Sequence, residues 1–300
     1  MDVSLPKSSA RTIKSKGGEL ETVNGPAASQ VGTYIEIVNK NLKIGRIQSV
    51  LFDFDGTISV IREGWQDIMV PMMVEELMKT PKHEDEAILQ DYVREYVYLL
   101  TGKDTIYQMI RLAEEVEKRG GKPLDPLEYK REYHRRLWKR IEHRVAGLKS
   151  GSIDPHEMVI EGAIELLEEL HSRGLDMYLA SGTDHQYVVD EAKALGIDKY
   201  FGDRIYGALD NYWERSKALV IKGILETNNL RGDSLLCFGD GFVEIENCKE
   251  VGGLAIGVAS DEVNRRGINE WKRERLIRAG ADVIIPDYTD LAAITKLLFP

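Results

Sequence analysis

Hydrophobic residues follow two different spacings along this chain. Near the start, the apolar runs at 33–38 and 47–54 are short and nearly continuous, which predicts strands, the second of them a buried parallel strand. From about residue 64 to residue 147, apolar positions recur at three- and four-residue steps, as Ile88, Tyr92 and Tyr96 illustrate. This is the spacing of amphipathic helices, so the stretch predicts a helical bundle.

After residue 150 the two spacings alternate. Helices are expected at about 160–172, after Asp184 and after Trp213, and the predicted strands lie at 176–181, 204–209, 234–240, 254–260 and 282–287. Alternating strands and helices indicate a parallel sheet with helices on both faces.

The order of these elements predicts the domain organisation. The expected fold class is α/β, a three-layer Rossmann-like parallel sheet with an all-helical cap inserted after the first buried strand. The predicted units are a flexible extension at 1–30, a core made of 31–60 and 151–300, and a cap at 61–150. Ligands of open α/β sheets bind beyond the carboxyl ends of the strands, so the cap is expected to cover that edge as a lid.

Composition and charge disfavour several classes of protein. The 300 residues are 43% hydrophobic, and no apolar run approaches the ~20 residues that span a bilayer, so no membrane partner is expected. The formal net charge of −10 disfavours general nucleic-acid binding but permits a local cationic pocket. Cys237 and Cys248 have neither disulfide nor zinc spacing, and the first 30 residues lack the apolar core of a secretory signal. A cytoplasmic location is therefore expected.

The segment VLFDFDGT, residues 50–57, carries the first candidate chemistry. Asp53 and Asp55 are two residues apart at the end of a predicted strand, so their side chains would project to the same side. Two neighbouring carboxylates repel each other, and a fold that keeps them together usually gains a bound cation or a chemical step. The alternative interpretation is an ordinary Asp-Gly turn that ends the strand.

Two further strand ends supply groups suited to a phosphoryl group or a divalent cation. Ser181 and Gly182 provide a hydroxyl and an N–H that an anion can approach closely. Asp240, in the sequence GDG, and Glu244 provide the hard oxygen ligands that Mg²⁺ prefers. These residues indicate a site for a phosphorylated ligand and its metal.

A cation for the phosphate is also available. Lys217 lies near the start of a predicted helix, where its charge could reach phosphate oxygens. Two alternatives stay open at this point. Lys222 is a rival for the same role, and Ser181 could simply cap the helix that follows it.

This ordered set of residues resembles the haloacid dehalogenase superfamily of phosphohydrolases. Its motifs are a DxDxT loop (here 53–57), a Ser or Thr after the second strand (Ser181), a Lys (Lys217) and a GDxxxD or GDxxxE segment (here 239–244). The resemblance covers roughly residue 49 to the C-terminus. The position of the insertion is similar to that of the helical cap in phosphoglycolate phosphatase and β-phosphoglucomutase-like members.

The resemblance implies a role for each motif residue. Asp53 would attack phosphorus and form an aspartyl-phosphate, and Asp55 would act as general acid and then general base. Mg²⁺ would be held by Asp53, the backbone carbonyl of Asp55 and Asp240, with Glu244 bound directly or through water. The groups implied for the phosphoryl oxygens are Ser181, Lys217 and the N–H groups of Gly56 and Gly182.

The acid at position 55 narrows the reaction that the resemblance implies. Family members that dehalogenate lack an acid there, and the transport ATPases carry Thr, so Asp55 favours a phosphatase or a phosphomutase. The leading hypothesis is a Mg²⁺-dependent hydrolase of a small phosphorylated metabolite, with a sugar phosphate as the expected class. A β-phosphoglucomutase-like phosphomutase shares every motif and is the alternative.

Two cap cations and one basic helix complete the candidates. Arg62 and Lys103 are placed where caps of this type often carry substrate-contacting residues, although either could be solvated. The stretch 128–144 is rich in Lys and Arg and could be read as a nucleic-acid face. Its apolar stripe favours a cap helix with a charged outer side, so a small metabolite rather than nucleic acid is the expected partner.

Overall fold

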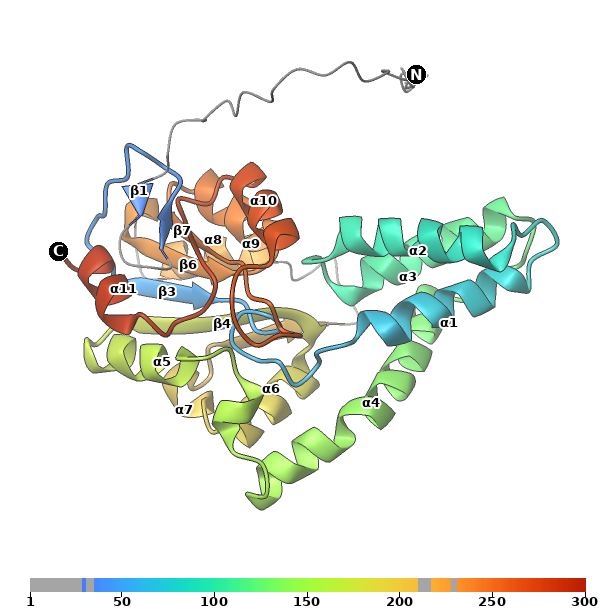
Figure 1. Ribbon diagram of the computed structural model, residues 1–300, viewed down its shortest axis with the longest axis horizontal. Helices are drawn as coiled ribbons and strands as arrows, with labels where there is room; N and C mark the ends of the chain where they lie inside the picture. Colours follow the sequence, from blue (N-terminus) through green and yellow to red (C-terminus); the bar gives the residue numbers. More distant parts are fainter. Residues whose placement is uncertain (1–28, 31–34, 210–216, 228–230) are drawn as a thin grey trace, which may run out of the picture.

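The computed structural model describes residues 29–30, 35–209, 217–227 and 231–300, with the backbone alone at 29, 30, 217 and 218. Its core is an eight-stranded sheet within these ranges, in the order β1-β2-β8-β7-β6-β3-β4-β5 (Figure 1). The strands are β1 (Ser29–Gln30), β2 (Glu36–Ile37), β3 (Ser49–Phe52), β4 (Asp176–Asp184), β5 (Ile205–Ala208), β6 (Leu235–Gly239), β7 (Leu254–Val258) and β8 (Val283–Ile285).

The sheet is parallel from β8 to β5, and an antiparallel pair, β1 and β2, extends its edge beside β8. The strand expected at 33–38 is therefore observed at 36–37, and its first two residues lie outside the described residues. Of the predicted extension at 1–30, residues 1–28 lie outside the described part, whereas 29–30 pair with β2.

Helices cover both faces of the sheet (Figure 1). One face carries α8 (Lys217–Thr227), α9 (Phe242–Glu250) and α10 (Glu270–Arg278). The other carries α5 (Ala163–Ser172), α6 (His185–Ala194), α7 (Asp198–Phe201) and α11 (Leu291–Leu298). Because side chains alternate along a strand, Val50 and Phe52 of β3 join one apolar cluster while Leu51 joins the cluster on the opposite face. Short 3₁₀ helices occur at Pro155–Met158 and Gly232–Ser234.

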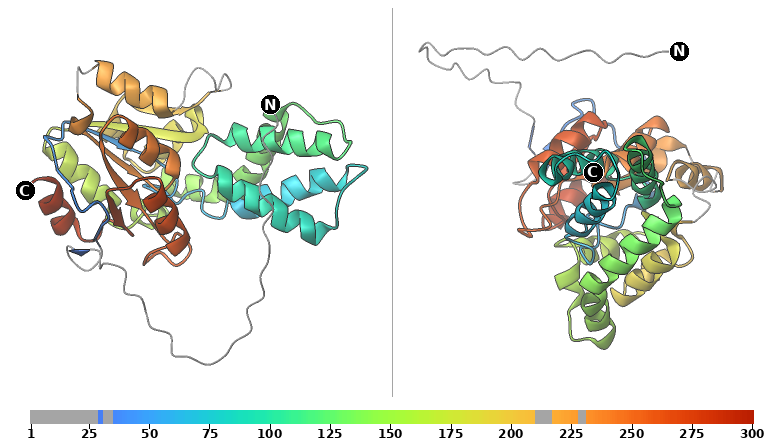
Figure 2. Two further views of the ribbon diagram at one scale, coloured as in Figure 1. Left: turned by 90° about the horizontal axis from the view of Figure 1, so that it is seen from above. Right: turned by 90° about the vertical axis from the view of Figure 1, so that its right-hand side faces the viewer.

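The connection from β3 to β4 forms the helical cap, which consists of α1 (Gln66–Met78), α2 (Glu86–Leu100), α3 (Thr105–Lys118) and α4 (Pro126–Ser150). Figures 1 and 2 show it as a separate lobe beyond the end of the sheet toward which β3 points. Its interior is apolar and fully buried, and includes Met69, Met72, Met73, Leu77, Leu89, Val93, Met109 and Leu112. None of the helices in the described ranges is long and apolar enough to cross a membrane.

The longest cap helix, α4, has clear signals at both ends. Asp125 precedes it and accepts a hydrogen bond from the N–H of Leu127, while Pro126 occupies the first turn, where a missing N–H costs nothing. Gly151 ends the helix at φ 74°, a left-handed conformation that glycine adopts without strain. The helix thus spans from the cap back to the core, where it packs against α6.

The register of the three central strands aligns their carboxyl ends. Phe52 of β3 pairs with Leu179 of β4 on one side and with Phe238 of β6 on the other. The N–H of Asp53 continues the ladder by donating to the Phe238 carbonyl at 2.9 Å. Residues that follow these strands are therefore delivered to one edge, beneath the cap.

Candidate active site

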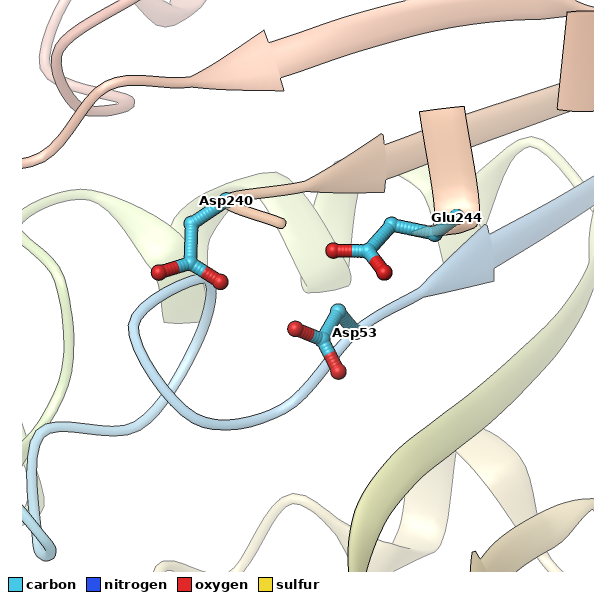
Figure 3. Close-up of side chains that lie close together, drawn as sticks. All are labelled: Asp53, Asp240 and Glu244. Atoms are coloured by element: carbon cyan, nitrogen blue, oxygen red, sulfur yellow. The ribbon is translucent and has the colours of Figure 1, made fainter. Parts of the chain in front are cut away.

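Three carboxylates meet at this edge (Figure 3). Asp53 follows β3, Asp240 follows β6, and Glu244 lies in the first turn of α9. Each offers an oxygen that lies within 4.8 Å of the others. Asp53 and Glu244 are buried, and the N–H of Gly241 donates to Glu244 Oε1 at 2.7 Å, which holds that side chain in place.

The donor set fits a divalent cation. Oxygens of three carboxylates are hard ligands of the kind that Mg²⁺ and Ca²⁺ select, and they converge from three separate elements. Buried like charges at such spacing are costly unless a cation offsets them. The structure brings together the three predicted ligand side chains, those of Asp53, Asp240 and Glu244, and their binding of a metal stays a prediction.

Asp55 is held by two hydroxyls of β4. Thr183 Oγ1 donates to Asp55 Oδ2 at 2.9 Å and Ser181 Oγ donates to the same oxygen at 3.3 Å, while Arg62 Nε lies 3.8 Å from Oδ1. Burial raises the pKa of Asp55, and the nearby Arg62 guanidinium partly opposes this effect. A carboxyl group with a raised pKa is suited to give up and take back a proton.

Gly56 permits the tight loop that follows. Its φ of 77° lies in the left-handed region, and a Cβ at this position would lie 2.3 Å from Asp240 Oδ2. Its N–H donates to the Ser59 carbonyl at 2.9 Å. If this N–H also bound a phosphate, as the resemblance implies, its hydrogen would have to be shared with the Ser59 carbonyl. Both the left-handed φ and the close approach of Asp240 favour glycine at this position.

The cap loop between α2 and α3 lies directly over the carboxylates. A Cβ on Gly241 would lie 2.9 Å from Gly102 Cα, and one on Gly182 would lie 3.1 Å from Asp104 Cα, so the backbones of cap and core touch through glycines. The pocket between them measures about 100 Å³. Ligand sites usually measure about 300–1,000 Å³, so this is a closed arrangement that a substrate larger than a phosphoryl group must open.

The profile of the haloacid dehalogenase-like hydrolases matches residues 47–252, which include all four predicted motifs. The chain belongs to this family.

Two curated relatives of the hydrolase are phosphatases. Phosphoserine phosphatase of Campylobacter jejuni is 26% identical over 160 residues, which cover 50% of this chain and 69% of the relative. A 5′-nucleotidase of Pseudomonas aeruginosa is 27% identical over 128 residues, covering 41% of this chain and 55% of the relative. Together with the family membership, these relatives confirm the prediction of a phosphatase enzyme.

Solved structures show the same fold. A crystal structure described as a predicted phosphoglycolate phosphatase from Haemophilus somnus has a TM-score of 0.57 and 17% identity, and it covers 84% of the hydrolase and 100% of that chain. A β-phosphoglucomutase from Clostridium difficile has a TM-score of 0.51 and 14% identity, covering 77% and 98%. The predicted α/β fold class with its helical cap is confirmed.

The two candidate lysines of α8 have different outcomes. Lys217 is the first residue of α8, and its side chain lies outside the described residues, so its contact with phosphate stays a prediction. Lys222 pairs with Glu226 at 3.7 Å and has a side chain that is 68% exposed. Lys222 therefore faces solvent and is not the cation of the site.

The two cap cations both line the pocket of the hydrolase. Arg62 is buried, and its guanidinium binds Glu191 of α6 through Nη2 at 2.6 Å and Nε at 3.1 Å. Lys103 is exposed, with Nζ 5.7 Å from the centre of the Tyr107 ring. Arg62 is thus fixed in place, whereas Lys103 has the freedom to follow a substrate.

A larger cavity, of about 990 Å³, lies between α4 and α6. Arg62 borders both cavities, but the carboxylates at 53, 240 and 244 line only the smaller one or lie beneath it. The smaller pocket is therefore the one that the predicted catalytic aspartates line.

The basic stretch 128–144 lies within α4, and acidic partners neutralise many of its cations. Arg135 and Arg136 pair with Glu132, Arg140 pairs with Asp67, and Arg144 pairs with Glu63. Lys130 is buried and pairs with Asp184. This is the pattern of a packed cap helix with a solvated outer side, and it favours that interpretation over a nucleic-acid face.

Sequence reasoning missed several groups at the site. Thr183, which donates to Asp55, lies two residues after Ser181 at the same strand end, so its hydroxyl could have been predicted to lie near the site. Glu262 and Lys272 gather around Asp240, and Arg275 contacts the cap loop, yet all three follow residue 252, where the family match ends. No motif spacing pointed to them.

Proposed function

We propose that the chain is a Mg²⁺-dependent phosphomonoester hydrolase that acts on a small phosphorylated metabolite through an aspartyl-phosphate at Asp53. One observation carries the proposal. Oxygens of Asp53, Asp240 and Glu244 converge within 4.8 Å, and Asp55, two residues after the nucleophile, is held by the hydroxyls of Ser181 and Thr183. A nucleophile, a metal site and a proton carrier are thus present at one pocket.

In the first half-reaction, a carboxylate oxygen of Asp53 forms a bond to phosphorus while the bond from phosphorus to the leaving oxygen breaks. Asp55 gives its proton to that oxygen, for which its raised pKa prepares it. In the second half, Asp55 takes a proton from water, whose oxygen attacks phosphorus and displaces Asp53. Inorganic phosphate leaves, and both aspartates return to their starting states.

Mg²⁺ bound by Asp53, Asp240 and Glu244, with the Asp55 carbonyl, would offset the repulsion between the anionic nucleophile and the anionic phosphoryl group. The chain's own groups for the phosphoryl oxygens are proposed to be Ser181, the N–H of Gly182 and Lys217. Ser181 is well placed because its hydroxyl already contacts Asp55.

The closed cap supports a small substrate. The pocket of about 100 Å³ is lined by the cap loop at 101–103 and by Arg62, so a bulky macromolecule would have no access to Asp53. We propose that Arg62 and Lys103 contact the part of the substrate that is not transferred. Two cations at this position favour a metabolite with hydroxyl or carboxylate groups, and a sugar phosphate is the proposed class.

A phosphate-release screen tests the proposal. Sugar phosphates, phosphoglycolate, phosphoserine and nucleoside monophosphates are incubated with the protein, with Mg²⁺ and with a chelator. We expect release that needs Mg²⁺ and that Asp53→Asn abolishes, while Asp203→Asn, at an exposed aspartate, has no effect. Release that survives chelation or Asp53→Asn would refute the mechanism. Isomerised product without phosphate would establish the phosphomutase instead.

A further inference from the structure

Lys272 places a buried ammonium beside a proposed metal ligand. The residue lies in the first turn of α10, is 8% exposed, and its Nζ lies 2.8 Å from Asp240 Oδ2. The same Nζ donates to Glu262 Oε1 at 2.7 Å and to Ser260 Oγ at 3.2 Å. An ammonium has three N–H donors, so these three acceptors use its full capacity.

The loop that carries these partners is closed on itself and attached to the catalytic loop. Ser260 pairs with Ile268, and the N–H of Asn269 donates to the Ala259 carbonyl at 2.8 Å, so 260–269 returns to where it began. Ser260 Oγ donates to the Gly56 carbonyl at 2.7 Å. The ammonium therefore belongs to a network that links Asp240 to the loop that follows Asp53.

Glu262 balances the charge of Lys272 next to the carboxylates. Its side chain is 20% exposed and lines the same pocket as Asp53 and Asp240. Together the two residues add no net charge, but the positive group is the one directed at Asp240. A divalent cation at Asp240 would be repelled by this ammonium and attracted by the Glu262 carboxylate.

We propose that Lys272 and Glu262 form a charge-balanced pair beside Asp240 that sets how tightly the site binds a divalent cation. The proposal rests on the proposed function, because it concerns the metal of that same site. Its consequence is a metal that exchanges with solution, since Lys272 competes with it for the charge of Asp240.

Because the two side chains carry opposite charges, removing one or the other should change the Mg²⁺ affinity in opposite directions. Glu262→Gln leaves the ammonium unbalanced and should weaken Mg²⁺ binding about tenfold. Lys272→Met leaves the carboxylate unbalanced and should tighten Mg²⁺ binding by a similar factor. The double variant removes both charges, so its affinity should return to within about threefold of the parent.

Isothermal titration calorimetry with MgCl₂, in the absence of substrate, measures these affinities on the full chain. Lys272→Arg keeps the charge and should bind Mg²⁺ within about threefold of the parent. Glu274→Gln removes an exposed carboxylate from the same helix and serves as the matched control, with no change expected. Thermal unfolding verifies that each variant is folded. If Lys272→Met does not fold, Glu262→Gln and Lys272→Arg together still test the proposal.

Weaker Mg²⁺ binding in both Glu262→Gln and Lys272→Met would overturn the proposal, because it would indicate that the two residues act through packing and not through charge balance. Unchanged affinity in Glu262→Gln would overturn it as well. Failure of the proposed function looks different. If the parent binds no Mg²⁺, or if Asp240→Asn binds it as the parent does, then the metal site itself is wrong, and this inference is wrong with it.

Discussion

Arg275 of α10 should control how firmly the cap closes. Its guanidinium donates from Nη1 to the Tyr98 carbonyl at 2.6 Å and from Nη2 to the carbonyls of Leu99 and Thr101, each at 2.9 Å. These carbonyls end α2, whose last turn has no basic residue of its own. The core thus supplies the cation that a helix C-terminus attracts, and it does so next to the loop that covers the pocket. The perturbation is Arg275→Met, which removes the donors and keeps an unbranched side chain.

The magnitude follows from these contacts. Hydrogen bonds from a charged donor contribute roughly 1.5–3 kcal/mol each when buried, but Arg275 is only half-buried, so we take roughly 2 kcal/mol for all three. The guanidinium also lies 4.6 Å from the centre of the Phe242 ring, a contact that the methionine partly replaces. A change of ~2 kcal/mol raises the ratio of open to closed cap roughly 30-fold.

Thiol labelling measures that ratio. Gln108 of α3 lines the pocket and is 4% exposed, so the thiol of Gln108→Cys should react only when the cap opens. Both natural cysteines, Cys237 and Cys248, are fully buried and give a low background. In the Gln108→Cys background, Arg275→Met should increase the labelling rate roughly 30-fold, because this rate is proportional to the open population.

Arg278→Met is the matched control. Arg278 lies on the same helix, is 76% exposed and pairs with Glu274, so its loss should leave the labelling rate unchanged. Equal labelling of the parent and Arg275→Met proteins would refute the argument that the three carbonyl contacts hold the cap closed. An equal increase in both variants would show that only the helix had been weakened.

Three further predictions concern the site and the cap interface. Gly56→Ala should lower phosphate release about 10- to 100-fold in a steady-state assay, because a Cβ would lie 2.3 Å from Asp240 Oδ2; activity equal to the parent would contradict the close approach. Thr183→Val should lower kcat about tenfold while calorimetry gives an unchanged Mg²⁺ affinity, since it removes a donor to Asp55 only; a parallel loss of both would contradict this role. Burial lowers the pKa of His134 to about 3, below the ~6.5 of an unfolded chain, so the stability that its neutral form provides above pH 6.5 is lost as pH falls toward 3. Between pH 6.5 and pH 5, denaturant unfolding should show the parent losing roughly 2 kcal/mol more than His134→Phe, and parallel pH profiles would refute this.

Much of the fold could be predicted because its signals are local. The apolar run of β3 and the Asp-Gly that ends it are adjacent in the chain, and period-2 and period-3.6 patterns arise from backbone geometry alone. The alternation after residue 150 therefore predicted a parallel sheet, which the structure contains. Because parallel strands end at one edge, Asp53 and Asp240 could be expected near each other.

The groups around those aspartates could not be predicted in the same way. Glu262, Lys272 and Arg275 lie in the sequence SDEVNRRGINEWKRERL, where nine of the seventeen residues are charged and none is distinguished by its spacing. The loop at 260–269 folds back on itself and leads directly into α10. In this position of the helix, Lys272 points inward to Asp240 and Arg275 points toward the end of α2. An exposed lysine and a buried one have the same letter in the sequence.

The sequence by itself indicated the alternation of strands and helices, the insertion of the cap and the two aspartates that are proposed to react. Only the tertiary structure decided which hydroxyls hold Asp55, which cation faces Asp240 and how closely Gly102 approaches Gly241. The physical reason is distance. Backbone periodicity acts over a few residues, whereas charge balance and cap closure depend on groups that are remote along the chain and meet within a few ångströms only after it has folded.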